Sequence, residues 1–106
     1  MTTGKEGKKK TEFVKENGKL TVSVVGKVDT VTAPELEKAV FDHLDGVVEL
    51  VLDLNEMSYT SSAGLRTFLK LQKAMNQKGA MKVIHVCDEV MEIFELTGFS
   101  AILTIE

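Results

Sequence analysis

Three consecutive hydroxyl residues, Thr60, Ser61 and Ser62, are the side chains whose type and spacing best fit a chemical role. They follow an apolar run over residues 47–54 and precede an amphipathic segment. A short apolar run rich in β-branched residues is typical of a strand buried on both faces, and the amphipathic segment is typical of a helix. The serines therefore lie at a helix N-terminus, where free N–H groups and the helix dipole favour an anion such as phosphate.

Catalysis and helix capping are the two other roles open to these serines. A serine at a strand-to-helix turn is typical of a hydrolase, but the Gly-x-Ser-x-Gly elbow and the Ser-x-x-Lys motif are both absent here. His43 and His85 fall in a helical and a strand pattern, and neither pattern brings a histidine to Ser62. We therefore predict that the chain is not an enzyme. Capping remains open, because serine is a good N-cap that contributes about 1 kcal/mol.

Length and charge limit the class of protein. The chain has 106 residues and a mass of 11.7 kDa, which fits one domain. Its net charge of -3 argues against nucleic acid as a partner, since phosphate-backbone binding needs a basic surface. The single cysteine, Cys87, lies in no metal-binding pattern. No apolar segment reaches the about 18 residues of a membrane span, so a cytoplasmic protein that binds no membrane is expected.

The order of the predicted elements indicates the fold. Residues 1–10 are polar and without periodicity, and are expected to be a disordered tail. Asn17-Gly18 predicts a hairpin between strands over residues 12–16 and 20–28. Thr32 and Glu35 have the spacing of a capping box. Helices are expected over about residues 33–45, 63–78 and 88–97, and further strands over about residues 47–54, 81–87 and 101–105.

Alternation of strands and helices with short connections predicts parallel pairing through right-handed crossovers. We therefore expect an α/β domain with a mixed, mostly parallel sheet that is antiparallel only at the opening hairpin, and with three helices on one face. Asp29 and Asp53 are both expected to end strands. Because the ends of parallel strands meet at one edge, these two carboxylates are predicted to lie near the serines.

Two sequence blocks resemble the signature of the anti-sigma-factor antagonists, the single-domain members of the STAS family. One block comprises Leu-Asp-Leu at 52–54, Met-Ser-Tyr at 57–59 and Ser-Ser-Ala-Gly-Leu at 61–65, and the other is residues 26–36. The resemblance covers about residues 11–106 and implies a STAS domain built as a small βα superhelix. In that family a partner kinase phosphorylates the serine two residues before the motif glycine.

Ser62 holds that position ahead of Gly64, so the resemblance implies that Ser62 is the phosphorylated residue. Many members have aspartate where this chain has Ser61, which leaves Ser61 as a rival acceptor, and many have a hydroxyl residue where this chain has Ala63. The family also implies a partner surface at this edge. Its expected residues are Asp29, Thr30, Asp53, Thr60, Ser61, Ala63 and Gly64.

The function implied by the resemblance is a switch. The unphosphorylated form would bind an anti-sigma factor that is also a serine kinase, and would thereby free the sigma factor. A serine phosphatase would reset the switch. The chain would need no cofactor, since ATP and Mg²⁺ belong to the partner kinase. The alternative is a non-switching STAS scaffold or a ligand-sensing domain in a signalling complex, in which Ser62 only caps its helix.

Overall fold

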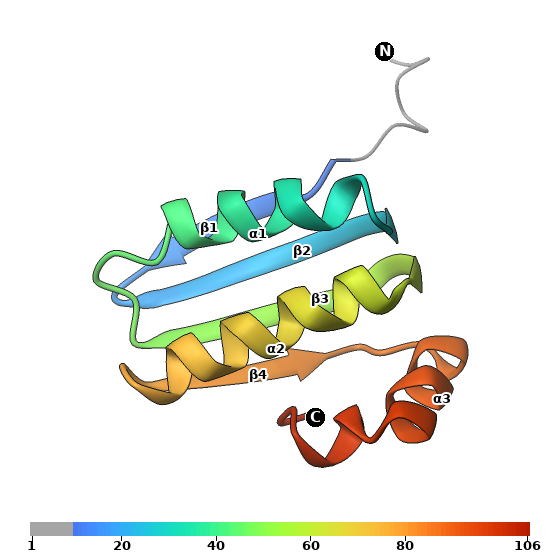
Figure 1. The fold of residues 1–106 in the computed structure, drawn as a ribbon. Helices are drawn as coiled ribbons and strands as arrows, with labels where there is room; N and C mark the ends of the chain where they lie inside the picture. The colour runs from blue at the N-terminus through green and yellow to red at the C-terminus, as the bar shows by residue number, and fades with distance from the viewer. Residues whose placement is uncertain (1–9) are drawn as a thin grey trace.

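A four-stranded sheet with helices packed on one face forms the protein in the computed structural model, which describes residues 10–106 (Figure 1). The strands are β1 (Glu12–Glu16), β2 (Lys19–Val28), β3 (Glu49–Thr60) and β4 (Ala80–Ile84), and they lie in that order. The helices are α1 (Thr32–Asp42), α2 (Ser62–Asn76) and α3 (Asp88–Thr97), with the 3₁₀ helix η2 (Phe99–Ala101) after them. The tail predicted over residues 1–10 lies outside the described residues, apart from Lys10.

The sheet has the predicted mixture of directions. β1 pairs antiparallel with β2, whereas β2 with β3 and β3 with β4 are parallel. The opening hairpin turns at Asn17 and Gly18, whose φ angles of 50° and 82° are both positive. A two-residue turn with positive φ at both positions suits the right-handed twist of the strands it joins, which is why Asn-Gly specifies it. The predicted hairpin is confirmed.

One hydrophobic core lies between the sheet and the three helices. Phe68 of α2 and Phe94 of α3 meet edge to face, with ring centroids 6.2 Å apart. Both rings are fully buried, so α3 belongs to the same layer as α2. Strands β2 and β3 and all three helices contribute aliphatic side chains to this single cluster, among them Leu20, Val22, Leu50, Leu52, Leu36, Val40, Leu71, Met75 and Val90.

The second face of the sheet has no helix over it in the described part of the chain, so the prediction that β3 is buried on both faces is wrong. Val51 is buried on that face, with 3% of its surface exposed, but it lies outside the core cluster. Its neighbours on the same face, Glu49 and Asp53, are only half-buried, and Asn55 is exposed. One valine had made an alternating strand resemble a continuous apolar run.

β3 is also longer than predicted, because it continues through Asn55 to Thr60 instead of turning after Leu54. Its pairing with β2 shifts twice, between Ser23 and Val25 and between Gly26 and Lys27. At each shift β3 contains one residue more than β2, and such β-bulges break the two-residue alternation. The polar residues around Met57 therefore resemble a turn in the sequence while forming part of a bulged strand.

The last predicted strand, over residues 101–105, is replaced by other structure. The chain after α3 forms η2 and then makes a single parallel bridge between Val83 and Ile105. Gly98 adopts the left-handed conformation with φ 84°, which ends α3 as the sequence predicted. Leu103 is buried, so this segment closes the core by packing, with only one bridge to the sheet.

Gly79, at the entry to β4, has no room for a side chain. A Cβ there would overlap the carbonyl oxygen of Val48 and lie 2.7 Å from its carbonyl carbon. We expect Gly79→Ala to lower the free energy of unfolding by about 3 kcal/mol or more, because backbone must move to make space. Gly46→Ala is the control, since Gly46 has φ 78° but open space around it. Gly46→Ala should lower the free energy of unfolding by about 1 kcal/mol, because only its backbone conformation is unfavourable for alanine. If urea unfolding gave equal losses of stability for the two variants, crowding at Gly79 would be contradicted.

Candidate functional site

The candidate site lies where β2 and β3 end and α1 and α2 begin. Val28 and Thr60 are paired at the ends of the two strands, and the Ser61 N–H donates to the Val28 carbonyl over 2.8 Å. The first helical hydrogen bond follows at once, from the Leu65 N–H to the Ser61 carbonyl over 3.0 Å. No loop separates β3 from α2, so the sheet fixes the position of the first helical turn.

Gly64 allows α2 to approach the strands this closely. A Cβ at Gly64 would overlap the Thr60 Oγ1 and would lie 2.9 Å from Val28 Cγ1. Thr60 is buried, with 2% of its surface exposed, and its hydroxyl donates to the Ser61 carbonyl over 3.2 Å. Thr60 and Gly64, both predicted as partner-binding residues, are therefore buried beneath the site and fix the position of α2 against the strands.

The two neighbouring serines differ sharply in exposure. Ser61 is the N-cap residue of α2 in an extended conformation, but its side chain makes no capping hydrogen bond. Its Oγ is buried and has no hydrogen-bond partner among the described residues. Ser62, the first residue of the helix, is exposed. Only the Ser62 hydroxyl is open to solvent, beside N–H groups of the first helical turn that have no acceptor within the helix.

Asp29 shapes the neighbouring loop before α1. Its Oδ1 accepts hydrogen bonds from the N–H groups of Val31 and Thr32, over 2.9 and 3.0 Å. The backbone hydrogen bond from Thr32, followed by the one from Val31, lowers the pKa of the Asp29 carboxyl from its ordinary value. Both bonds favour the ionised form, so this edge of the sheet carries a fixed negative charge.

The capping box predicted for Thr32 and Glu35 is wrong. The Thr32 hydroxyl accepts from the Asp29 N–H over 2.8 Å and donates to the Lys27 carbonyl over 2.9 Å, and it makes no bond to Glu35. Asp29 satisfies the amides at the start of α1 instead. A capping box requires the threonine to precede the helix, whereas Thr32 is already its first residue.

The remaining predicted residues of this edge differ in access. Thr30 is exposed between Asp29 and α1. Ala63 is half-buried and packs against the core. The structure thus brings together six of the predicted residues besides Ser62, and all of these except Thr60 and Gly64 present at least part of their surface to solvent.

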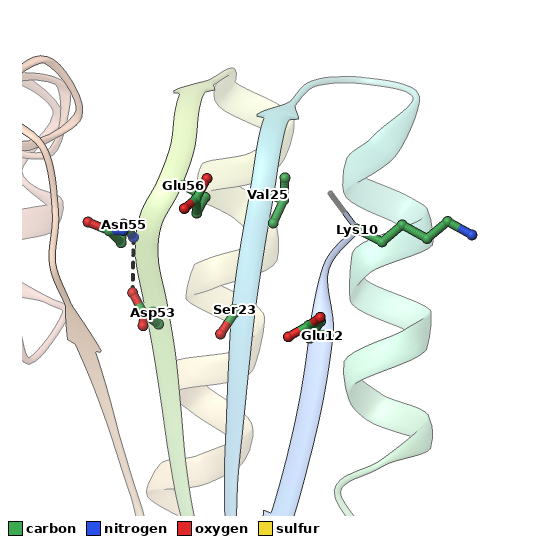
Figure 2. A pocket seen from close by; sticks show the side chains of 7 residues that line it. All are labelled: Lys10, Glu12, Ser23, Val25, Asp53, Asn55 and Glu56. Atoms are coloured by element: carbon green, nitrogen blue, oxygen red, sulfur yellow. Dashed lines mark hydrogen bonds between the residues drawn. The ribbon is translucent and has the colours of Figure 1, made fainter. Parts of the chain in front are cut away.

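Asp53 lies elsewhere, on the face of the sheet that has no helices (Figure 2). It is seven residues before Thr60 on an extended strand, which corresponds to roughly 20 Å along β3. The prediction that Asp53 ends its strand beside Asp29 is therefore wrong. The residue does mark the end of another pairing, since β4 leaves the sheet after Ile84, opposite Asp53.

A shallow groove of about 520 Å³ surrounds Asp53 on this open face, lined also by Glu12, Ser23 and Asn55 (Figure 2). The Asp53 Oδ1 accepts from the Asn55 N–H and lies 3.0 Å from His85 Nδ1. His85 has a φ of 58°, an uncommon conformation for a residue other than glycine. No sequence signal predicted this contact, because it depends on the turn that the chain makes after β4.

Residues 10–106 hold neither a cluster of metal-ligating side chains nor a helix that could cross a membrane. This part of the chain contains no group of three or more histidine, cysteine or carboxylate side chains that could hold a metal ion. None of its helices is both long enough and apolar enough to cross a membrane.

Comparison with known proteins gives the family. The sequence matches the STAS domain over residues 10–106, nearly the whole chain. The chain belongs to the STAS domain family. The Listeria monocytogenes protein named anti-sigma-B factor antagonist is 34% identical to this STAS domain over 90 residues, which cover 82% of this chain and 78% of the relative. The prediction of a single STAS-like α/β domain is confirmed.

Solved structures show the same fold. An anti-sigma factor antagonist from Mycobacterium paratuberculosis superposes with a TM-score of 0.81 at 27% identity, over 90% of this chain and 82% of that one. Unphosphorylated SpoIIAA superposes with a TM-score of 0.78 at 11% identity, over 91% and 87% of the two chains. The phosphorylated form of SpoIIAA from Bacillus gives a TM-score of 0.71 over 91% and 90%.

The charge on Asp29 should make the stability of the domain depend on pH. The pKa of Asp29 is below its ordinary value of 3.8 in the folded protein, so its contribution is fully present above 3.8 and is lost as the pH falls through the lower folded pKa. We expect Asp29→Asn to lower the urea midpoint at neutral pH. Below pH 3.8 the midpoints of the variant and the original should converge.

Asp45→Asn is the matched control, because the exposed Asp45 side chain has no hydrogen bond in the described part of the chain. Asp45→Asn should leave the urea midpoint unchanged both at neutral pH and below pH 3.8. A constant difference between Asp29→Asn and the original protein across the acid range would show that the charge of Asp29 has no part in its effect.

Proposed function

We propose that this STAS domain is an anti-sigma factor antagonist whose binding is switched by phosphorylation of Ser62. The exposed Ser62 hydroxyl on the first turn of α2, beside the loop of Asp29, is the observation that carries the proposal. A kinase must reach its acceptor oxygen, and an antagonist must present the same surface to its partner. One exposed hydroxyl on a rigid edge meets both needs.

Burial argues for Ser62 over its rival Ser61. The Ser61 Oγ is inaccessible, and its residue is tied to β2 through the hydrogen bond from its N–H to Val28. Phosphorylation of Ser61 would require the strand end to open before the transfer. Ser62 can accept phosphate with no change in the backbone.

A phosphate on Ser62 is well tolerated by the domain itself. Phosphoserine brings about 1.5 to 2 negative charges, and the free N–H groups and dipole of a helix N-terminus favour a negative group by about 0.3 to 1 kcal/mol per charge. SpoIIAA, which shares the fold, has been solved in both forms, so the fold is compatible with phosphorylation. We therefore expect the switch to operate without refolding.

The effect on a docked partner is unfavourable. Two like charges about 6 Å apart at an effective dielectric constant near 20 repel by roughly 3 kcal/mol, which corresponds to more than a hundredfold in affinity. Asp29 already gives this edge a negative charge, so phosphate on Ser62 would add to it. Local repulsion and bulk suffice to release the partner.

In the proposed cycle, other proteins catalyse the addition and removal of the phosphate. In its unphosphorylated form the domain binds an anti-sigma factor that is also a serine kinase and thereby frees the sigma factor. The kinase supplies ATP and Mg²⁺, and a serine phosphatase restores the unphosphorylated form. The domain itself is a substrate and a binding module, with no catalytic residue of its own.

The acceptor can be tested directly with the anti-sigma factor kinase of the same organism. We expect Ser62→Ala to abolish incorporation of phosphate from ATP, and Ser61→Ala to retain it, because Ser62 is exposed whereas the Ser61 Oγ is buried. Phosphopeptide mapping of the original protein identifies the site independently. Phosphate found on Ser61 with none on Ser62 would overturn the assignment.

Binding separates the switch from a passive scaffold. By calorimetry, Ser62→Ala should bind the kinase as tightly as the original protein and resist release by ATP and Mg²⁺. Ser62→Asp should bind at least about tenfold more weakly, since a carboxylate has about half the charge of the phosphate. Ser100→Asp places the same charge on exposed η2 and serves as the control. Equal affinity for the original protein, Ser62→Asp and the phosphorylated protein would favour the non-switching scaffold or ligand-sensing domain.

A further inference from the structure

Arg66 lies one helical turn after Ser62 on α2, at the i+4 position. Side chains four residues apart lie on the same face of a helix, with Cβ atoms about 6 Å apart. Both residues are exposed. The two side chains can therefore reach each other through solvent without a change in the backbone.

The direction of the helix favours this contact. The Cα–Cβ bonds of an α-helix tilt toward its N-terminus, so the Arg66 side chain leans toward Ser62. An acidic group placed four residues before a basic one is also the more favourable order, because both then agree with the helix dipole. The pair Ser62 and Arg66 has this order as soon as Ser62 becomes acidic.

Arg66 has no competing partner in the part of the chain that is described. The other two basic side chains of α2 are less suitable. Lys70 already pairs with Glu37 of α1 over 3.3 Å, and Lys73 lies nearly two turns beyond Arg66 along the helix. A guanidinium presents several N–H donors in a plane and can bind two phosphate oxygens at once. Among the basic side chains of α2, Arg66 is the one best placed for a phosphate on Ser62.

We propose that Arg66 binds the phosphate on Ser62 within the same chain, and that phosphorylation thereby withdraws the Arg66 guanidinium from contact with a partner. This inference rests on the proposed modification of Ser62. In the unphosphorylated domain the Arg66 guanidinium is free to contact a partner. Once the phosphate is present, the guanidinium turns to the phosphate and is no longer available to the partner, so phosphorylation also removes a contact that the unphosphorylated domain can offer.

The pairing can be measured without any kinase or partner. Phosphoserine is incorporated at position 62 during protein synthesis, and the second pKa of the phosphate is followed by phosphorus NMR. A nearby cation stabilises the dianion, so we expect Arg66→Gln to raise this pKa by about 0.3 of a pH unit. Asp29, the carboxylate of the neighbouring loop, acts equally on both proteins and does not affect the comparison.

Two further variants make the result specific. Lys73→Gln removes the same charge from the same helix beyond contact distance and should leave the phosphate pKa unchanged. Arg66→Lys should give an intermediate value, since an ammonium keeps the charge but loses the planar pair of donors. The Arg66 Nε–H resonance should also shift as the phosphate gains its second charge.

An equal phosphate pKa in the original protein and Arg66→Gln, or an Arg66 Nε–H resonance that does not respond to the phosphate, would overturn the inference. Failure of the proposed function would appear elsewhere, as absence of kinase-dependent phosphate on Ser62. The two outcomes are distinguishable because the incorporated phosphoserine does not depend on a kinase.

Discussion

The close contact between the first turn of α2 and the ends of β2 and β3 is the constraint on which the site depends. Gly64 permits it, because any Cβ would meet the Thr60 hydroxyl and the Val28 side chain. The Ser61 N–H completes the contact by extending the β2–β3 ladder to Val28. With the backbone fixed on both sides, Ser62 stands at one defined position above the sheet edge. In the proposed cycle, a charge added there would change the surface of the domain while its shape stays the same.

The neighbouring hydroxyl and acidic residues have different roles in this rigid edge. Thr60 and the Ser61 side chain are enclosed and hold the strand end, whereas Ser62 faces solvent. Asp29 stabilises the adjacent turn by accepting hydrogen bonds from the N–H groups of Val31 and Thr32, and its negative charge lies at this edge of the sheet. In the proposed cycle, the structural residues would leave Ser62 free to change its charge state at little conformational cost.

The two faces of the sheet also differ, one being apolar and the other polar. The face toward the helices is filled by one core cluster, while the other carries polar residues and the hydrogen-bonded contact between Asp53 and His85 (Figure 2). Asp53 therefore belongs to the open face and to the end of β4, well removed from Ser62. A charge on Asp53 would be separated from one on Ser62 by about two Debye lengths at physiological ionic strength and would act on it weakly.

The sequence by itself determined the elements whose signals are local: the Asn17-Gly18 hairpin, the order of strands and helices as far as α3, the end of α3 at Gly98, and the family motif around Ser62 and Gly64. Local backbone preference and hydrophobic periodicity are enough for these. Only the tertiary structure decided that β3 runs on through its bulges, that Asp53 faces away from the site, and that the Ser61 hydroxyl is buried while that of Ser62 is exposed. Each of these depends on which strand or helix lies alongside, and neighbouring residues in the chain contain no record of that.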